Sequence, residues 1–75
     1  MMAPQLPILS GKRVRAAFEK AGWECVRQRG SHMILVKDGS IATLSVPNHK
    51  EVARGTLRGL VKAAGMTISE FVELV

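Results

Sequence analysis

"HMILVKDGSIATLSVP", residues 32–47, is the stretch that decides the fold. Two apolar runs rich in β-branched residues flank Asp38-Gly39, a strong turn signal, and Pro47 ends the second run. The stretch therefore predicts a β-hairpin. A third strand is predicted just upstream in "WECVRQR", residues 23–29, because the apolar and β-branched residues there are followed by a break at Gly30.

A helix is predicted ahead of these strands in "SGKRVRAAFEKAG", residues 10–22. Ser10 is a favourable N-cap, and Gly22 is the usual left-handed stop at the other end. The apolar residues recur at the spacing of one helical face: Val14, Ala17, Phe18 and Ala21.

Two further helices are predicted after the hairpin. "GTLRGLVKAAG", residues 55–65, has apolar residues on one helical face and closes at Gly65, while residues 48–55 form a loop ahead of it. "TISEFVELV", residues 67–75, opens with Thr67 and Glu70 at capping-box spacing and predicts a short C-terminal helix.

This order predicts an α+β fold, α-β-β-β-α with a short C-terminal helix. A three-stranded antiparallel sheet needs one covered face, which two amphipathic helices provide, so we expect a two-layer sandwich with an open sheet surface. Residues 10–75 are expected to form a single domain. Residues 1–9 carry two prolines and no periodicity, which predicts a flexible arm or a partner-binding strand.

The charge of the chain points to its partners. The net charge is +5, and all eleven Lys and Arg lie between Lys12 and Lys62. This imbalance favours a phosphate backbone or an acidic protein surface as partner, with a merely solvated basic surface as the alternative. One cysteine, Cys25, cannot form an internal disulfide, which favours a reducing compartment, the cytoplasm. No apolar run approaches the length of a membrane span.

Several kinds of site are not supported by the sequence. The acids are few and scattered, and the spacings of Cys25, His32 and His49 match no familiar zinc pattern, so we expect no metal site. No G-x-S-x-G elbow of a serine hydrolase is present. The few aromatic residues are expected in the core, so recognition of RNA by shape and backbone charge fits better than base stacking.

His32 is the most interesting residue for chemistry. It follows Gly30-Ser31, where a tight backbone lets a phosphate approach, and two arginines precede it, Arg27 and Arg29. Imidazole exchanges protons near neutral pH without a metal, and RNA supplies its own nucleophile, the 2′-hydroxyl. A histidine at the start of a strand is more often structural, so these residues by themselves support only a basic, RNA-binding domain.

From Lys12 to Val72 the chain resembles the HicA (YcfA-like) family of small bacterial and archaeal toxins. The matching motifs are Ala21-Gly22-Trp23, Arg27-Gln28, Gly30-Ser31-His32, Pro47 with His49 and Lys50, Gly55-Thr56-Leu57, and Ala64-Gly65. The resemblance implies a double-stranded-RNA-binding-domain-like fold and a metal-independent mRNA interferase without cofactor. It also implies a HicB antitoxin partner and makes His32 the catalytic histidine.

The leading hypothesis is therefore an endoribonuclease in which His32 is general acid or base, assisted by Ser31 or His49. The residues expected to bind RNA are Lys12, Arg15, Arg27, Arg29, Lys50 and a helical ridge of Arg54, Arg58 and Lys62. Two alternatives stay open. One is a non-catalytic RNA-binding module of the same fold, and the other is an interaction protein whose basic face meets only an acidic partner.

Overall fold

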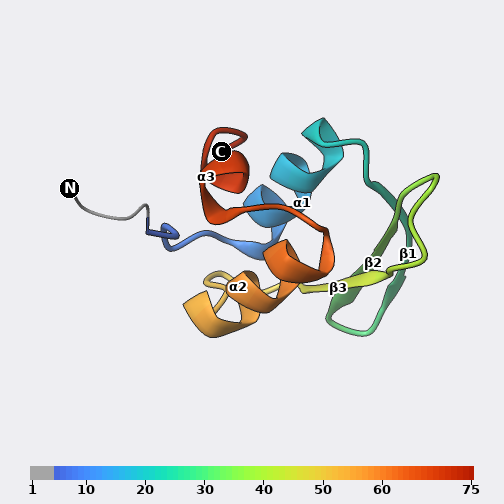
Figure 1. Ribbon diagram of the computed structural model, residues 1–75. Helices are drawn as coiled ribbons and strands as arrows, with labels where there is room; N and C mark the ends of the chain where they lie inside the picture. The colour runs from blue at the N-terminus through green and yellow to red at the C-terminus, as the bar shows by residue number, and fades with distance from the viewer. Residues whose placement is uncertain (1–4) are drawn as a thin grey trace.

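The computed structural model describes residues 5–75 and shows two layers, a three-stranded antiparallel sheet and a layer of helices on one of its faces (Figure 1). The strands lie in the order β1-β2-β3. The elements in chain order are α1 (Gly11–Lys20), β1 (Glu24–Arg29), β2 (His32–Val36), β3 (Leu44–Pro47), α2 (Arg54–Ala63) and α3 (Ile68–Val72). The predicted α+β order with a short C-terminal helix is confirmed.

The ends of the helices follow local capping signals. The Ser10 side chain accepts a hydrogen bond from the Arg13 backbone N–H at 3.2 Å, and Gly22 takes a positive φ of 98° after α1. At α3, the backbone N–H and the hydroxyl of Thr67 form a capping box with Glu70. These hydrogen bonds hold the pKa of the Glu70 carboxyl below its ordinary value. The bond with the Thr67 backbone has the larger effect and the bond with the Thr67 side chain the smaller one.

The core lies between the sheet and the helices. α1 packs on β1 and β3, and α2 packs on β3 and α3. Phe18 is central, because its ring contacts Trp23 edge-on at 6.4 Å between centroids and Phe71 at 4.9 Å. All three aromatic side chains are buried, which confirms that they belong to the core.

The predicted hairpin has a longer connection than its turn signal indicates. Asp38-Gly39 does form a turn, with φ of 82° at Gly39 and a hydrogen bond from the Ser40 N–H to the Lys37 carbonyl oxygen at 3.1 Å. The second strand of the hairpin, β3, begins only at Leu44. Ile41, which was predicted to lie in this strand, is fully exposed and lies in the loop. The turn is therefore confirmed, while residues 37–43 all lie outside the strands.

The N-terminal segment differs from the predicted flexible arm over residues 5–9. Leu6 and Leu9 are only 2% and 5% exposed and belong to the core. The Val52 N–H donates to the Leu9 carbonyl oxygen at 2.8 Å, and the Arg54 Nε–H donates to the Leu6 carbonyl oxygen at 3.0 Å. Apolar burial overrides the absence of helical or strand periodicity here. The part of the predicted arm at residues 1–4 lies outside the described residues.

Candidate functional site

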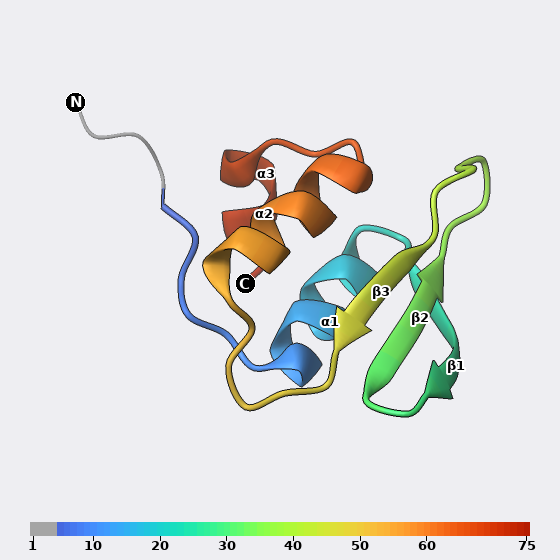
Figure 2. The same ribbon diagram turned by 90° about the horizontal axis from the view of Figure 1, so that it is seen from below.

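The two faces of the sheet have different surroundings. In β2, Met33 and Leu35 are buried towards the helices, so the alternating residues His32 and Ile34 point to the opposite side. We call the side that carries His32 and Ile34 the uncovered face. Within residues 5–75, the helices all lie on the other side of the sheet, as the second view of the ribbon makes clear (Figure 2).

A β-bulge in β1 decides which residues join His32 on this face. The pairing of β1 with β2 shifts between Cys25 and Arg27, and the Cys25 thiol donates to the Arg27 carbonyl oxygen at 3.5 Å across the irregularity. Val26, the extra residue, is 52% exposed. Simple alternation from Cys25, which packs on the core, would turn Arg27 and Arg29 towards the helices. The bulge instead places Arg29 opposite His32.

Three backbone segments meet at the end of the sheet where His32 begins β2. The Asn48 N–H donates to the Ser31 carbonyl oxygen at 2.6 Å, which joins the turn before β2 to the segment after β3. The Gly11 N–H donates to the His49 carbonyl oxygen at 2.8 Å, which joins that segment to the start of α1. Ser31, His32 and His49 are all exposed at this end of the sheet.

Gly11 permits the closest of these approaches. A Cβ atom at this position would overlap the Pro47 carbonyl oxygen and would lie 2.9 Å from Cα of Asn48. This role could not be predicted from the sequence, since a glycine directly after an N-cap carries no local signal of a distant contact. Lys12 follows at once and is exposed, so its charge lies in the same region.

The predicted RNA-binding residues fall into separate groups. Arg29 lies opposite His32, while Lys12 and Lys50 are chain neighbours of the Gly11–His49 hydrogen bond. Arg27 lies two pairings further along the sheet, on the same uncovered face, opposite Ile34.

The remaining four predicted RNA-binding residues are not gathered at His32. Arg15 forms an ion pair with Glu19 at 3.2 Å. Arg54 holds the N-terminal segment through its hydrogen bond to Leu6, and it therefore has a structural contact that the sequence analysis did not foresee. Arg58 and Lys62 are exposed on α2, in the helix layer.

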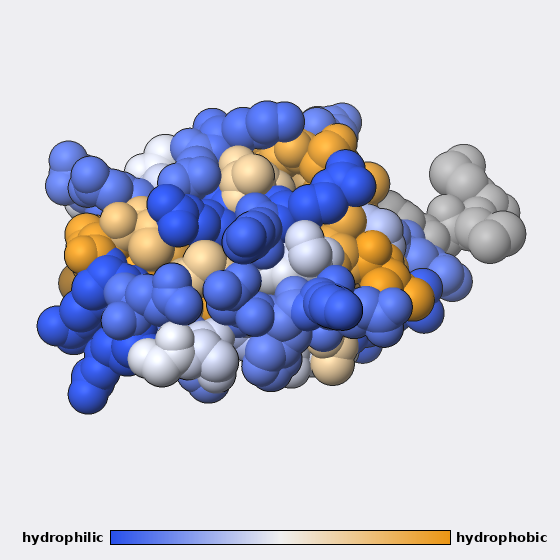
Figure 3. All heavy atoms as spheres, turned by 180° about the vertical axis from the view of Figure 1, so that it is seen from behind, coloured by the Kyte–Doolittle hydropathy of each residue, from blue (hydrophilic) through white to orange (hydrophobic). Residues whose placement is uncertain are grey.

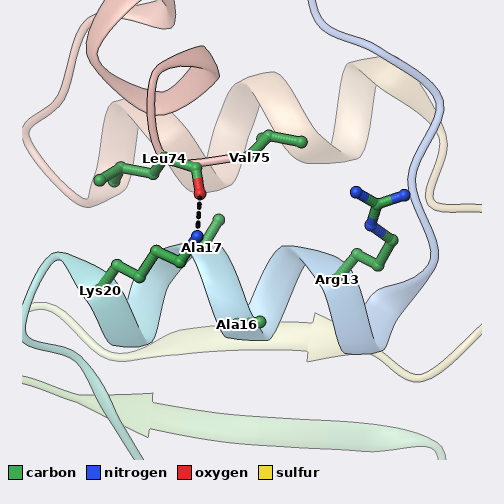
Figure 4. A pocket seen from close by; sticks show the side chains of 6 residues that line it. All are labelled: Arg13, Ala16, Ala17, Lys20, Leu74 and Val75. Carbon is green, nitrogen blue, oxygen red and sulfur yellow. Dashed lines mark hydrogen bonds between the residues drawn. The ribbon is translucent and has the colours of Figure 1, made fainter.

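Two hollows of the surface are lined by residues other than His32 and its strand partners. One is formed between α1 and the C-terminal end of the chain, where the Lys20 Nζ donates to the Leu74 carbonyl oxygen at 3.0 Å (Figure 4). Another is lined by residues 51–54 and Ile8. The face seen from behind is hydrophilic over most of its area, with apolar patches towards both sides of the view (Figure 3). The candidate site is thus an open surface, which suits a polymer better than an enclosed small molecule.

Residues 5–75 contain neither a cluster of candidate metal ligands nor a candidate membrane-spanning helix. In this part of the chain, no three His, Cys, Asp or Glu side chains gather so that they could hold a metal ion. No helix there is both long enough and apolar enough to cross a membrane.

Comparison with known proteins identifies the family. The family model described as the HicA toxin of bacterial toxin-antitoxin matches residues 11–66. The chain belongs to the HicA toxin family. The matched part of this HicA chain contains the whole sheet, α1, α2 and the His32 region, and leaves out α3 and the packed N-terminal segment. No curated protein and no solved structure matches the chain. Membership confirms the resemblance and makes the chain a toxin of the toxin-antitoxin type.

Proposed function

We propose that this HicA-family toxin is a metal-independent endoribonuclease that cleaves mRNA in the cytoplasm and is neutralised by a HicB-like antitoxin. The observation that carries the proposal is the placement of His32, which is exposed on an open surface and directly opposite Arg29. A proton-transfer group beside a cation supplies two of the functions that cleavage of a phosphodiester uses, proton transfer and stabilisation of the phosphoryl charge.

The proposed reaction uses the RNA's own nucleophile. The 2′-oxygen attacks the adjacent phosphorus and the bond to the 5′-oxygen of the next nucleotide breaks, leaving a 2′,3′-cyclic phosphate and a 5′-hydroxyl. One group must take the 2′-hydroxyl proton and one must give a proton to the leaving 5′-oxygen. His32 performs one of these transfers. Arg29 stabilises the negative charge that develops on the phosphoryl oxygens.

The second proton-transfer group is proposed to be His49, with Ser31 as the other candidate. The hydrogen bond from the Asn48 N–H to the Ser31 carbonyl oxygen supports both, because it holds their backbones beside His32. Lys12 and Lys50 then supply phosphate contacts around this end of the sheet.

A non-catalytic RNA-binding module is the second candidate function. It is favoured by one observation: within residues 5–75, no hydrogen bond orients the His32 imidazole. Catalytic histidines are commonly held by a second group, although contacts in a free enzyme often tighten only when the substrate is bound.

The test is cleavage of RNA in EDTA by the wild-type protein and by His32→Ala. We expect the substitution to lower the rate by about 10²–10⁴-fold, the usual contribution of a general acid or base. The fold should be unaffected because His32 is exposed. DNA and RNA with a 2′-deoxy nucleotide at the cut site should resist cleavage, and the product should end in a cyclic phosphate or 3′-phosphate.

His49→Ala is the matched variant, a second exposed histidine at the same end of the sheet. A folded His32→Ala protein that cuts at the wild-type rate would move the chemistry to His49. Wild-type protein that binds RNA in EDTA but leaves it intact at high concentration would support the non-catalytic module instead.

A further inference from the structure

The uncovered face carries its positive charge at one end. The antiparallel register places these residues on it in opposed rows: Arg27, Arg29, His32, Ile34 and Ser45. The acid of β1, Glu24, pairs with Val36 at the far end of the sheet. Cations therefore lie near His32, and the carboxylate lies away from it.

The two arginines of this face are not neutralised by the protein. In residues 5–75, the ion pair that forms is Arg15 with Glu19, on α1. Arg27 and Arg29 are exposed and have no carboxylate partner in this part of the chain. Unpaired arginines on a strand present their guanidinium groups to solvent, where a phosphate can bind them through paired hydrogen bonds.

The arginines also form a line that ends at the histidine. Arg27 and Arg29 are two residues apart on β1, past the bulge, so their side chains leave the same face about 6.6 Å apart at ~3.3 Å per residue. A nucleic-acid backbone that passes Arg27 reaches Arg29 next, and the residue opposite Arg29 is His32. The bulge thus places Arg27 and Arg29 in one row and brings the end of that row opposite His32.

The surface suits one strand rather than a duplex. Three strands at a spacing of ~4.8 Å span only about 10 Å, room for a single backbone. Double-stranded RNA is recognised across its grooves over many base pairs, by elements that project into them, whereas only the sheet itself forms this face. The aromatic side chains that would stack bases are buried, so contact with phosphates must supply the affinity.

We propose that the substrate RNA crosses the uncovered face as a single strand, with consecutive phosphates on Arg27 and Arg29 and the scissile phosphate at His32. The binding surface is then the sheet, rather than the basic ridge of α2. The position of the cleaved phosphate at His32 rests on the proposed function, whereas binding of RNA on the sheet can be tested separately.

The test is binding of a single-stranded oligoribonucleotide over a range of salt concentrations, with the His32→Ala protein as parent so that the RNA stays intact. Arg27→Gln/Arg29→Gln should weaken binding and reduce the slope of log affinity against log salt by about 1.4, since each phosphate contact on a single strand contributes ~0.7. Arg27→Lys/Arg29→Lys should retain most of the slope. In proteins with His32 intact, the Gln pair should raise KM, and the loss of Arg29 should also lower kcat.

The matched control is Arg13→Gln/Lys20→Gln, which removes two charges from α1 in the other layer, beside the C-terminal end (Figure 4). Its salt slope should equal that of the parent. Melting temperatures of all variants establish that each is folded.

Three outcomes would overturn the inference. They are an unchanged slope for the Arg27/Arg29 pair, a larger loss for Arg58→Gln/Lys62→Gln than for that pair, and tighter binding of a duplex than of a single strand of equal length. Failure of the wild type to cut RNA would instead overturn the proposed function and leave the binding result standing.

Discussion

At the scale of single residues, the candidate site depends on the absence of a Cβ atom at Gly11. Its N–H donates to the His49 carbonyl oxygen, and its Cα lies so close to Pro47 that a side chain has no room. The obstacle is backbone, which cannot rotate aside as a flexible side chain would. The end of β3 and the start of α1 can therefore meet only around a glycine.

We expect Gly11→Ala to destabilise the protein by about 1–3 kcal/mol, the usual effect of overpacking. Because the strain falls on the segment that carries His49, RNA cleavage at a temperature where the variant stays folded should also fall. Urea unfolding and cleavage rates measure the two effects. Gly59→Ala is the control: nothing lies within 4 Å of a Cβ there, so the variant should gain up to ~1 kcal/mol from helix propensity. Equal stabilities of the two variants would contradict the close approach.

At the scale of elements, the N-terminal segment acts as a brace for the loop between β3 and α2. It runs beside that loop and is joined to it where the Val52 N–H donates to the Leu9 carbonyl oxygen. It is joined to the start of α2 where the Arg54 Nε–H donates to the Leu6 carbonyl oxygen. The loop carries His49 and Lys50, so a segment outside the family match positions part of the candidate site.

Leu6→Ala should therefore loosen the loop as well as remove core contacts. A buried Leu replaced by Ala costs about 2–5 kcal/mol, and amide hydrogen exchange at Val52 should accelerate because its acceptor, the Leu9 carbonyl, is less firmly held. Ile8→Ala is the control, since Ile8 is 57% exposed and its loss should change stability by less than about 0.5 kcal/mol. If Leu6→Ala behaves like Ile8→Ala, the segment is not a brace.

At the scale of the whole molecule, one aromatic cluster joins parts of the chain that are far apart. Phe18 of α1 contacts Trp23, at the entry to β1, and Phe71 of α3. α3 lies beyond the family match, yet Phe71 is fully buried. A chain of 75 residues has only about 4–11 kcal/mol of stability at ~0.05–0.15 kcal/mol per residue, so each core aromatic is a large fraction of it.

Phe71→Ala should cost about 3–5 kcal/mol and leave the protein close to unfolded at 37 °C. Thermal and urea unfolding followed by Trp23 fluorescence measure this loss, since the indole lies in the same cluster. Val75→Ala is the matched change at a half-exposed position in the C-terminal end and should have little effect. A loss below 1 kcal/mol for Phe71→Ala would mean that α3 is dispensable for the core.

Local signals predicted most of the elements, because their causes lie within a few residues. The Ser10 cap, the Thr67–Glu70 capping box and the turn at Asp38-Gly39 are each made between neighbours in the chain. The burial of Leu6 could not be predicted in this way, since its partners come from elements far along the sequence.

For the candidate site, the sequence by itself determined the composition: His32, the basic residues and the family motif. Only the tertiary structure decided their arrangement. The bulge turned Arg27 and Arg29 to the face of His32, against the alternation that Cys25 begins. The hydrogen bond from Asn48 to Ser31 likewise joins the residue that follows β3 to the residue that precedes β2. Capping and periodicity depend on neighbours along the chain, whereas the face of a side chain and the meeting of loops depend on strand register and packing, which only the folded chain supplies.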